Sequence, residues 1–320
     1  MSSLLVIGGS GFFGKSILSS YKRGLLSQWG ISSIKVVSRH ATRLPIKYPE
    51  LNHPTITLHD LDASKCTSLP FADYVIHAAA NVDSTPYLES PDQRETDIRA
   101  VMENYNRLAP IYHRDSKVLY VSSGAIYGVS NDLAKRAEES QPVGAIKTMA
   151  PLKRHYALAK LDAEAKMRQL AANGLNISIA RCFAFAGEYL PRDGTFAFGS
   201  FIRDGFDQRP ITVTAKNKVY RTYMHADDLV YWLMTIAEAS SPLCPIYNVG
   251  SDEVIELKEL AIKIGRYFNV AVETTPEASN TADVYLPCIK RAQTELNLHI
   301  TVPLDEAIHK TAISIKRTSG

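Results

Sequence analysis

The chain has 320 residues, of which 45% are hydrophobic, so it can bury a sizeable core as one large domain or two closely joined ones. Its formal net charge is +3 and its basic residues are scattered, which argues against nucleic acid or a membrane surface as a partner. No apolar run approaches the roughly 20 residues of a membrane span, and "MSSLLVIGGSG" lacks the features of a signal peptide.

Cysteine and histidine usage adds two expectations. The four cysteines are far apart and form no C-x-x-C pair, which predicts reduced thiols and a cytoplasmic protein. The nine histidines show no spacing typical of metal ligands, so we predict no metal site.

The first half of the chain alternates short apolar runs with segments of helical periodicity. We predict strands at Leu4–Ile7, Ile34–Ser38, Thr55–His59, Tyr74–His77, Val118–Ser122 and Ile177–Ala180. The predicted helices between them include Phe12–Tyr21, Glu95–Ala109 and Lys153–Asn173. This alternation is typical of an α/β fold of Rossmann type, a doubly wound parallel sheet covered on both faces.

After Arg181 the rhythm changes, because glycine, proline and aromatic residues crowd the next twenty positions. Further along we predict a strand near Ile211–Thr214 and helices near Ser200–Gln208, Asp227–Ala239, Leu257–Phe268 and Leu304–Lys316. These elements predict a smaller, more irregular C-terminal α/β lobe.

A glycine-rich loop lies between the first predicted strand and helix. In "VIGGSGFFG", Gly8, Gly11 and Gly14 follow one another at three-residue intervals. Small residues there permit a tight turn, a close backbone approach to a pyrophosphate and close packing of the helix on the sheet. The start of the helix also offers free N–H groups to an anion. The loop therefore predicts a dinucleotide site.

The Gly-x-x-Gly-x-x-Gly spacing resembles the extended short-chain dehydrogenase/reductase family of nucleotide-sugar epimerases, dehydratases and reductases. "HDLDA", "VIHAAA", "RTYMHADDL" and "YNVGS" are similar to further stretches of that family, so the resemblance covers nearly the whole chain. It implies that the cofactor is contacted by Gly8, Ser10, Gly11, Phe12, Phe13, Gly14, Asp60, Leu61, Ala78, Ala79 and Ala80. Asp97 and Ala184 stand at two positions where the family has Asn, which leaves the roles of these two positions open.

Tyr156 and Lys160 are four residues apart on a predicted helix and therefore share one face. A tyrosine can protonate the oxyanion formed at a reduced carbonyl, but its ordinary pKa of about 10 is too high for efficient acid–base work near neutrality. We expect the Lys160 ammonium to lower that pKa and, as in the family, to hold the nicotinamide ribose. The resemblance assigns Ser123, after the fifth strand, to orienting the carbonyl.

Three histidines near these motifs are expected to be structural. His155 sits beside Tyr156 and so on another face of the helix, and His77 is expected to pack at a strand end. For His225 we expect a hydrogen-bonded role near the helix that begins at Asp227.

The cofactor preference depends on "KVVSRH", where the second strand ends. The family has an acidic residue there that favours NAD, whereas this chain has Ser38 and Arg39. A guanidinium attracts a 2′-phosphate that an acid would repel, so we predict that NADP(H) is preferred. NAD(H) stays possible, because an arginine can also stack on adenine.

The resemblance also narrows the reaction. Gly124 and Ala125 occupy the positions of the Asp-Glu pair of the family's dehydratases, and neither can move a proton. The remaining chemistry is at the carbonyl carbon alone, as a reduction or a 4-epimerisation, and Arg39 favours a reductase. We therefore predict reduction of the 4-keto group of a nucleotide-activated 4-keto-6-deoxy sugar with NADPH, as in deoxysugar biosynthesis. The alternatives are an NAD-dependent nucleotide-sugar 4-epimerase and a non-catalytic NADP-sensing regulator.

The resemblance further implies that Arg221 binds the pyrophosphate of a nucleotide-diphosphate sugar and that the chain forms a homodimer through Glu95–Ala109 and Lys153–Asn173. We expect residues 1–183 plus about 220–250 to form the dinucleotide-binding domain, and residues 184–219 plus 251–320 the nucleotide-sugar-binding lobe.

Overall fold

The computed structural model describes residues 1–80, 88–142, 144, 146–194, 196–276 and 281–318, and the chain forms two compact units. The first unit contains Met1–Ile126, Ile146–Cys182 and Val230–Tyr247. The second contains Tyr127–Ala145, Phe183–Leu229 and Asn248–Gly320. Each unit is described below by itself.

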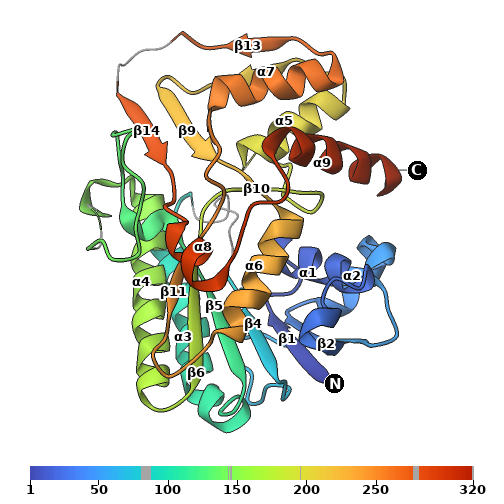
Figure 1. The fold of residues 1–320 in the computed structure, drawn as a ribbon, viewed down its shortest axis with the longest axis vertical. Helices are drawn as coiled ribbons and strands as arrows, with labels where there is room; N and C mark the ends of the chain where they lie inside the picture. The colour runs from blue at the N-terminus through green and yellow to red at the C-terminus, as the bar shows by residue number, and fades with distance from the viewer. Residues whose placement is uncertain (81–87, 143, 145, 195, 277–280, 319–320) are drawn as a thin grey trace. The chain divides into compact units, whose positions relative to one another are not determined.

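The first unit is built on a seven-stranded sheet with the strand order β11-β6-β5-β4-β1-β2-β3 (Figure 1). Its strands are β1 (Ser2–Ile7), β2 (Ile31–Ser38), β3 (Ile56–Asp60), β4 (Tyr74–His77), β5 (Lys117–Ser123), β6 (Asn176–Cys182) and β11 (Ile246–Val249). The pairings from β3 through β6 are all parallel, which confirms the predicted α/β fold of Rossmann type.

The strand register brings the predicted motifs to one edge of this sheet. Ile7 lies beside His77, and His77 lies beside Tyr120. Ser123, three residues further along β5, pairs with Cys182 at the end of β6. The glycine loop, the segment after His77 and Ser123 therefore all follow the carboxyl ends of neighbouring strands, where ligands of open α/β sheets bind.

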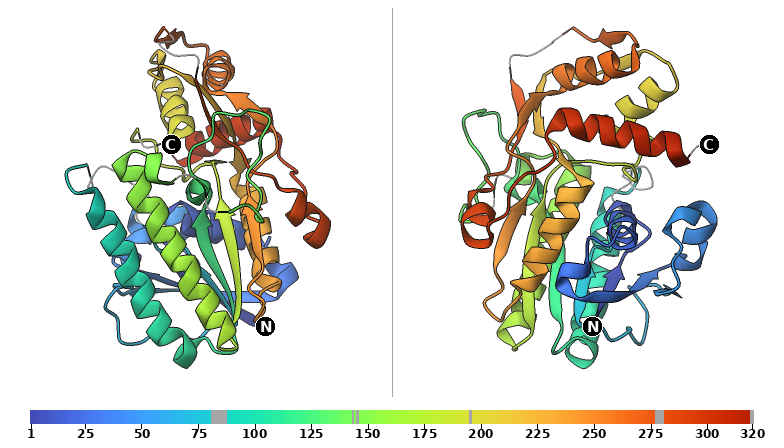
Figure 2. Two further views of the ribbon diagram at one scale, coloured as in Figure 1. Left: turned by 90° about the vertical axis from the view of Figure 1, so that its left-hand side faces the viewer. Right: turned by 45° about the vertical axis from the view of Figure 1, so that its right-hand side comes forward.

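Helices cover both faces of the sheet (Figures 1 and 2). The helices α3 (Pro91–Tyr112) and α4 (Pro151–Ala172) lie side by side on one face and bury the apolar stripes predicted for them. The other face carries α1 (Phe12–Lys22), the short α2 (Leu44–Lys47) and the first unit's part of α6 (Ala226–Glu238). Both α3 and α4 begin at a proline, whose fixed φ suits the first helical turn.

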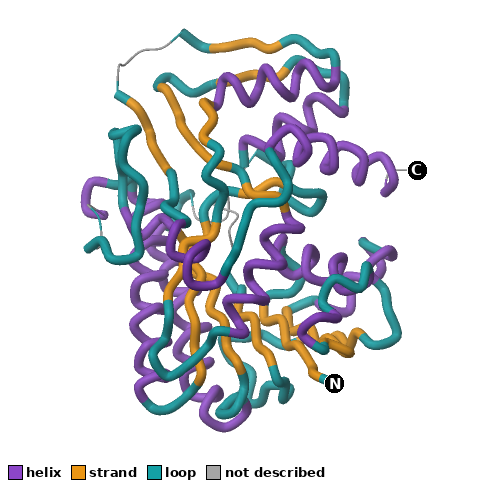
Figure 3. The backbone as a smooth tube through the Cα atoms, viewed as in Figure 1, coloured by secondary structure: helices purple, strands orange, loops and turns teal. Residues whose placement is uncertain are grey.

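The second unit has shorter strands and more loop than the first (Figure 3). Its central strand β9 (Lys218–Thr222) lies between β12 (Val254–Glu256) and β14 (Ala282–Tyr285), and two small sheets pair β8 (Ile211–Val213) with β13 (Val272–Thr274) and β7 (Phe185–Ala186) with β10 (Met224–His225). Its helices are α5 (Ala197–Phe206), α7 (Leu257–Phe268), α8 (Lys290–Leu296) and α9 (Leu304–Thr318). These smaller C-terminal sheets agree with the predicted C-terminal α/β lobe.

Two segments that the sequence suggested belong to the dinucleotide-binding domain, residues 127–145 and 220–229, pack in the second unit. The assignment of a cofactor to one unit and a nucleotide sugar to the other remains a prediction. Within the described residues, no helix combines the length and the apolar character needed to cross a bilayer.

Candidate active site

The glycine loop offers backbone rather than side chains at the start of α1. Gly8 has a φ of +86°, and a Cβ on it would lie 2.7 Å from the Cα of Ala79. A Cβ on Gly14 would lie 2.2 Å from the carbonyl oxygen of Gly9, so the helix also packs closely on the loop. Gly11 precedes the helix without a side-chain cap, and it is exposed like Ser10. These features fit a pyrophosphate held by N–H groups.

Asp60, at the end of β3, is hydrogen-bonded to the segment that follows β2. The Asp60 carboxylate accepts hydrogen bonds from the backbone N–H of Thr42 at 2.9 Å and from its hydroxyl at 2.5 Å, which lower the pKa of Asp60. The N–H of Leu61 donates to the carbonyl oxygen of Ser38 at 3.0 Å. Ser38 is buried, whereas the next residue, Arg39, is exposed to solvent.

The predicted catalytic residues meet on the first unit. Tyr156 and Lys160 lie on α4, and the Ser123 hydroxyl at the end of β5 lies near enough to Tyr156 to lower its pKa. The Lys160 ammonium donates to the carbonyl oxygen of Val121 at 2.8 Å and to the hydroxyl of Tyr120 at 3.2 Å. Lys160 is 2% exposed, whereas Tyr156 is only partly buried and can reach a substrate.

The electrostatics differ from the expectation in one respect. Burial raises the pKa of Tyr156, and the groups that oppose this rise are Arg94 and Ser123. Lys160, which we expected to lower the pKa of Tyr156, is directed toward β5 and lies 5.8 Å from the centroid of the tyrosine ring. Burial lowers the pKa of Lys160 itself to about 8.

Sequence reasoning missed Arg94. Its guanidinium carbon lies 4.2 Å from the centroid of the Tyr156 ring, and the residue is 7% exposed. The contact joins α3 to α4 across 62 positions of the chain, so no local spacing indicated it. The adjacent Glu95 pairs with Nδ1 of His155 at 2.7 Å, which gives His155 the structural role expected for it.

The other two histidines also agree with the sequence analysis. His77 is fully buried, with its ring centroid 4.7 Å from that of Tyr105 and 5.7 Å from that of Tyr120, and burial lowers its pKa to about 3. The Nδ1 atom of His225 accepts a hydrogen bond from the backbone N–H of Asp227 at 3.1 Å. Within the described residues, no three His, Cys, Asp or Glu side chains gather as a metal site would require.

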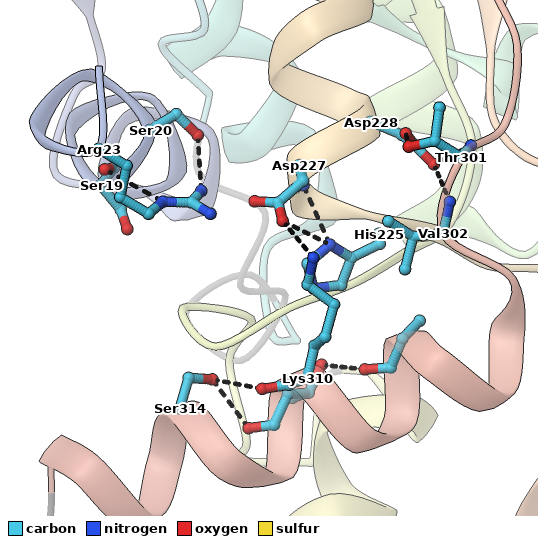
Figure 4. A network of polar contacts seen from close by, with 12 residues as sticks. Ser19, Ser20, Arg23, His225, Asp227, Asp228, Thr301, Val302, Lys310 and Ser314 are labelled. Atoms are coloured by element: carbon cyan, nitrogen blue, oxygen red, sulfur yellow. Dashed lines mark hydrogen bonds and ion pairs between the residues drawn. The ribbon is translucent and has the colours of Figure 1, made fainter. Parts of the chain in front are cut away.

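The "RTYMHADDL" segment organises part of the second unit (Figure 4). The Asp227 carboxylate pairs with Lys310 of α9 at 2.8 Å. Asp228 accepts hydrogen bonds from the backbone N–H groups of Thr301 and Val302, each at 3.0 Å. These carboxylates therefore hold the start of α6 to the C-terminal segments of its own unit.

Arg221, the predicted pyrophosphate ligand, is already engaged within the second unit. Its guanidinium pairs with the Asp283 carboxylate at 3.0 Å and donates to the carbonyl oxygens of Tyr220 and Asp283. Its guanidinium carbon also lies 5.7 Å from the centroid of the Tyr285 ring. The side chain is 18% exposed, so its binding to phosphate remains a prediction.

The two family Asn positions have different surroundings here. Asp97 accepts a hydrogen bond from the side-chain amide of Gln93 at 2.7 Å, one turn earlier on α3. Ala184 has no polar side chain, and its carbonyl oxygen accepts from the N–H of Met224 at 3.1 Å. The Asp97 carboxylate can accept a hydrogen bond as an asparagine amide does but cannot donate one, and Ala184 can do neither through its side chain.

The sheet, the glycine loop and the Ser123–Tyr156–Lys160 cluster agree with the class of NAD dependent epimerases and dehydratases. The chain belongs to the NAD dependent epimerase/dehydratase family, whose profile matches residues 4–250.

Individual relatives cover nearly the full length. The chain is 26% identical to dTDP-4-dehydro-6-deoxyglucose reductase of Escherichia coli over 329 aligned positions, which cover 98% of each chain. The structure is similar to dTDP-glucose 4,6-dehydratase of Streptomyces venezuelae, solved with NAD bound (TM-score 0.79, 17% identity, 98% and 97% of the two chains). It is also similar to UDP-glucose 4-epimerase of Thermotoga maritima, solved with UDP-glucose (TM-score 0.75, 16% identity, 99% of each chain). At these identities the two structures establish the fold alone.

Proposed function

We propose that the protein reduces the 4-keto group of a nucleotide-activated 4-keto-6-deoxy sugar with NADPH. The observation that carries the proposal is the proximity of the Ser123 hydroxyl to Tyr156, with Lys160 one helical turn away, at the carboxyl edge of the sheet. This arrangement serves chemistry at a single carbonyl carbon.

When bound, NADPH would supply the hydride. The residues of the chain that would hold it are the glycine loop, Ala78 to Ala80, Asp60 and Leu61, with Lys160 at the nicotinamide ribose. Ser123 would donate a hydrogen bond to the carbonyl oxygen and orient it. Tyr156 would then give its proton to the alkoxide that develops there, and solvent would later restore the proton.

The small residues after Ser123 support reduction over dehydration. Gly124 and Ala125 follow Ser123 directly in a short 3₁₀ segment, and neither carries an acid or a base. Removal of water from the sugar ring needs a proton acceptor and a proton donor at neighbouring carbons. The name of the Escherichia coli relative, a reductase of a dTDP-linked keto sugar, supports the same direction.

Ser38 and Arg39 support NADP(H) as the preferred cofactor, with NAD(H) possible. Ser38 is small and buried at the end of β2, and Arg39 directly after it is exposed. A planar guanidinium can bind a 2′-phosphate with two hydrogen bonds. Arg221 would bind the substrate pyrophosphate, and in doing so it would share or exchange its pairing with Asp283.

A homodimer and a cytoplasmic location complete the proposal. The paired helices α3 and α4 offer a two-helix face that a second copy could cover (Figure 2). Within the described residues, no disulfide joins any of the cysteines Cys66, Cys182, Cys244 and Cys288, which suits a reducing compartment.

An NAD-dependent 4-epimerase is the second candidate. The same Ser, Tyr and Lys set can oxidise and re-reduce one carbon, and the fold of the Thermotoga maritima epimerase is similar over 99% of this chain. A non-catalytic NADP-sensing regulator is less well supported, because such a protein needs no Tyr–Lys pair.

The test is incubation of the purified protein with CDP-, GDP-, UDP- and dTDP-linked 4-keto-6-deoxyhexoses while NADPH absorbance is followed. Consumption of NADPH with one of the four nucleotides is the expected result. Purified protein that already contains NAD and interconverts an intact nucleotide sugar without added reductant would favour the epimerase. Tight NADPH binding without turnover of any sugar would favour the regulator.

A further inference from the structure

Arg94 is the nearer of two buried cations to the proposed proton donor. It lies in the first turns of α3, and its guanidinium carbon is 4.2 Å from the centroid of the Tyr156 ring. The Lys160 ammonium is 5.8 Å from the same centroid and is hydrogen-bonded to β5. A guanidinium at this distance from an aromatic ring makes a cation–π contact, which is strongest where water is excluded.

The neighbouring residues fix this contact. Next to Arg94, Glu95 is paired with His155 at 2.7 Å, and His155 is next to Tyr156. Glu95 is also paired with Arg99 at 2.8 Å, one turn further along α3. The side chains of Glu95 and His155 are 16% and 23% exposed, so this link between the helices is largely shielded from solvent.

We propose that Arg94 is a positioning residue for the proposed reduction, because it holds the Tyr156 ring against Ser123 and stabilises the phenolate that remains when Tyr156 has given up its proton. In this step the O–H bond of Tyr156 breaks, a new O–H bond forms on the substrate oxygen, and the electrons for reduction of the carbon come from NADPH. The ring becomes more electron-rich as the proton leaves, so a cation over its face favours the product of the transfer.

The other groups that face Tyr156 do not replace Arg94. Burial raises the pKa of Tyr156 and the Cys182 thiol adds to the rise, while Arg94 is the largest influence that lowers it and the Ser123 hydroxyl is the next. Lys160 and Tyr120 complete the surroundings, and these two are hydrogen-bonded to each other at 3.2 Å.

The proposal rests on the proposed function, but its first test needs no substrate. Protein labelled with ¹³Cζ-tyrosine is titrated by NMR without cofactor, and Tyr156→Phe identifies the Tyr156 signal. We expect this signal to titrate at higher pH in Arg94→Met than in the wild type. The matched control is Arg107→Met, which removes an exposed guanidinium from the same helix, outside the Glu95–His155 link, and should leave the titration in place.

Arg94→Lys keeps the charge but not the planar group, so the Tyr156 signal should move in the same direction by less. If circular dichroism shows that Arg94→Met does not fold, the titration of the Tyr156 signal in Arg94→Lys tests the proposal. A Tyr156 signal that titrates at the wild-type pH in the folded Arg94 variants would overturn the proposal, whether or not a substrate has been found.

Once a substrate is known, the kinetics of Arg94→Met distinguish a residue that positions Tyr156 from a residue that binds the substrate. The reduction needs protonated Tyr156, so its rate falls as pH rises through the pKa of Tyr156, and Arg94→Met should move this alkaline fall to higher pH. Near neutral pH we expect kcat to drop about tenfold, the size of a desolvated cation–π contact, with KM nearly unchanged. A tenfold rise in KM with kcat and the tyrosine titration unchanged would show instead that Arg94 binds substrate.

Discussion

Helix α4 carries two buried charged side chains one turn apart, Glu164 and Lys160, and the groups that surround these two charges differ. Around Glu164, which is fully buried, the carboxylate accepts hydrogen bonds from the Ser122 hydroxyl at 2.7 Å and from the Arg181 guanidinium at 2.8 and 3.0 Å. Arg168 adds a further contact at 3.1 Å. Around Lys160, which is 2% exposed, the hydrogen-bond partners are the neutral Tyr120 hydroxyl and the Val121 carbonyl oxygen.

The difference separates a structural charge from a functional one. The negative charge of Glu164 is balanced by two arginines, so its site is complete without a ligand. Within the described residues, no carboxylate lies at ion-pair distance from Lys160, and burial accordingly lowers its pKa to about 8. An incompletely compensated buried cation is costly to stability, and its presence beside Tyr156 is the feature that we connect with function.

The largest expected effect is on catalysis, in Tyr156→Phe. Loss of the proton donor should lower kcat by about 10²- to 10⁴-fold, while the free energy of unfolding should change by about 1 kcal/mol or less, because only the hydroxyl of a partly exposed side chain is lost. The measurements are urea unfolding and NADPH consumption with the substrate that the assay of the four nucleotide-linked sugars identifies. A folded Tyr156→Phe protein that binds cofactor and keeps the wild-type rate would remove Tyr156 from the mechanism.

Much of this site could be predicted from the sequence, because its signals are local. Tyr156 and Lys160 are four residues apart on one helix, and the family resemblance assigned Ser123, which follows the predicted strand Val118–Ser122. The partners of these residues could not be predicted. Arg94 reaches Tyr156 from another helix, so the contact depends on how α3 and α4 pack.

The fold, too, could be predicted only where its signals in the sequence are local. The long, strongly periodic helices and the central strands were predicted, whereas strands such as β9 and β14 in the second unit were missed. These two strands are short and pair with each other across about sixty positions of the chain, so tertiary pairing rather than local pattern defines them.

The interpretation of Glu164 as a structural charge is tested by Glu164→Ala. Removal of the carboxylate takes away the two hydrogen bonds that buried Arg181 donates to it, so we expect a loss of about 3–5 kcal/mol in the free energy of unfolding. The matched control is Glu295→Ala, which breaks the exposed Arg291–Glu295 pair on α8 (3.0 Å) and should cost about 0.5 kcal/mol or less. Equal losses in the two variants, measured by urea unfolding, would contradict the view that Glu164 is a structural charge.

The opposite result is expected for Lys160→Met, which should abolish efficient turnover but stabilise the protein by about 1–2 kcal/mol near pH 7. The folded-state pKa of about 8 lies below the ordinary value of 10.5. Below pH 8 both the folded and the unfolded chain carry the proton, so the full cost of burying the charge is present. As pH rises from 8 toward 10.5 the folded protein loses its proton first, so wild-type stability rises relative to the variant.

Urea unfolding of the wild type and of Lys160→Met, near neutral pH and again in the alkaline range, measures the difference between their free energies of unfolding. This difference should become small in the alkaline samples. A Lys160→Met protein that is less stable than the wild type near neutral pH would mean that Tyr120 and Val121 compensate the charge fully, and the contrast with Glu164 would disappear.

The smallest effect concerns Arg39, a cation that is exposed instead of buried. Water solvates its charge, so its stability effect is small and a ligand must reveal its role. Arg39→Ser should lower the preference for NADPH over NADH about fivefold, because one charge-assisted contact to the 2′-phosphate is lost while the rest of the cofactor site is intact. The measurement is kcat/KM, or the binding constant, for each of the two cofactors.

The matched control is Arg43→Ser, since Arg43 is exposed in the same segment after β2. If Arg39 alone reads the phosphate, Arg43→Ser keeps the wild-type preference, and stability is unchanged in both variants. If the preference instead follows Arg43, the assignment of the 2′-phosphate to Arg39 is wrong. If neither variant changes it, Arg39 has the role of an adenine-stacking residue, and the case for an NADPH-dependent reductase over an NAD-dependent epimerase loses its support from this segment.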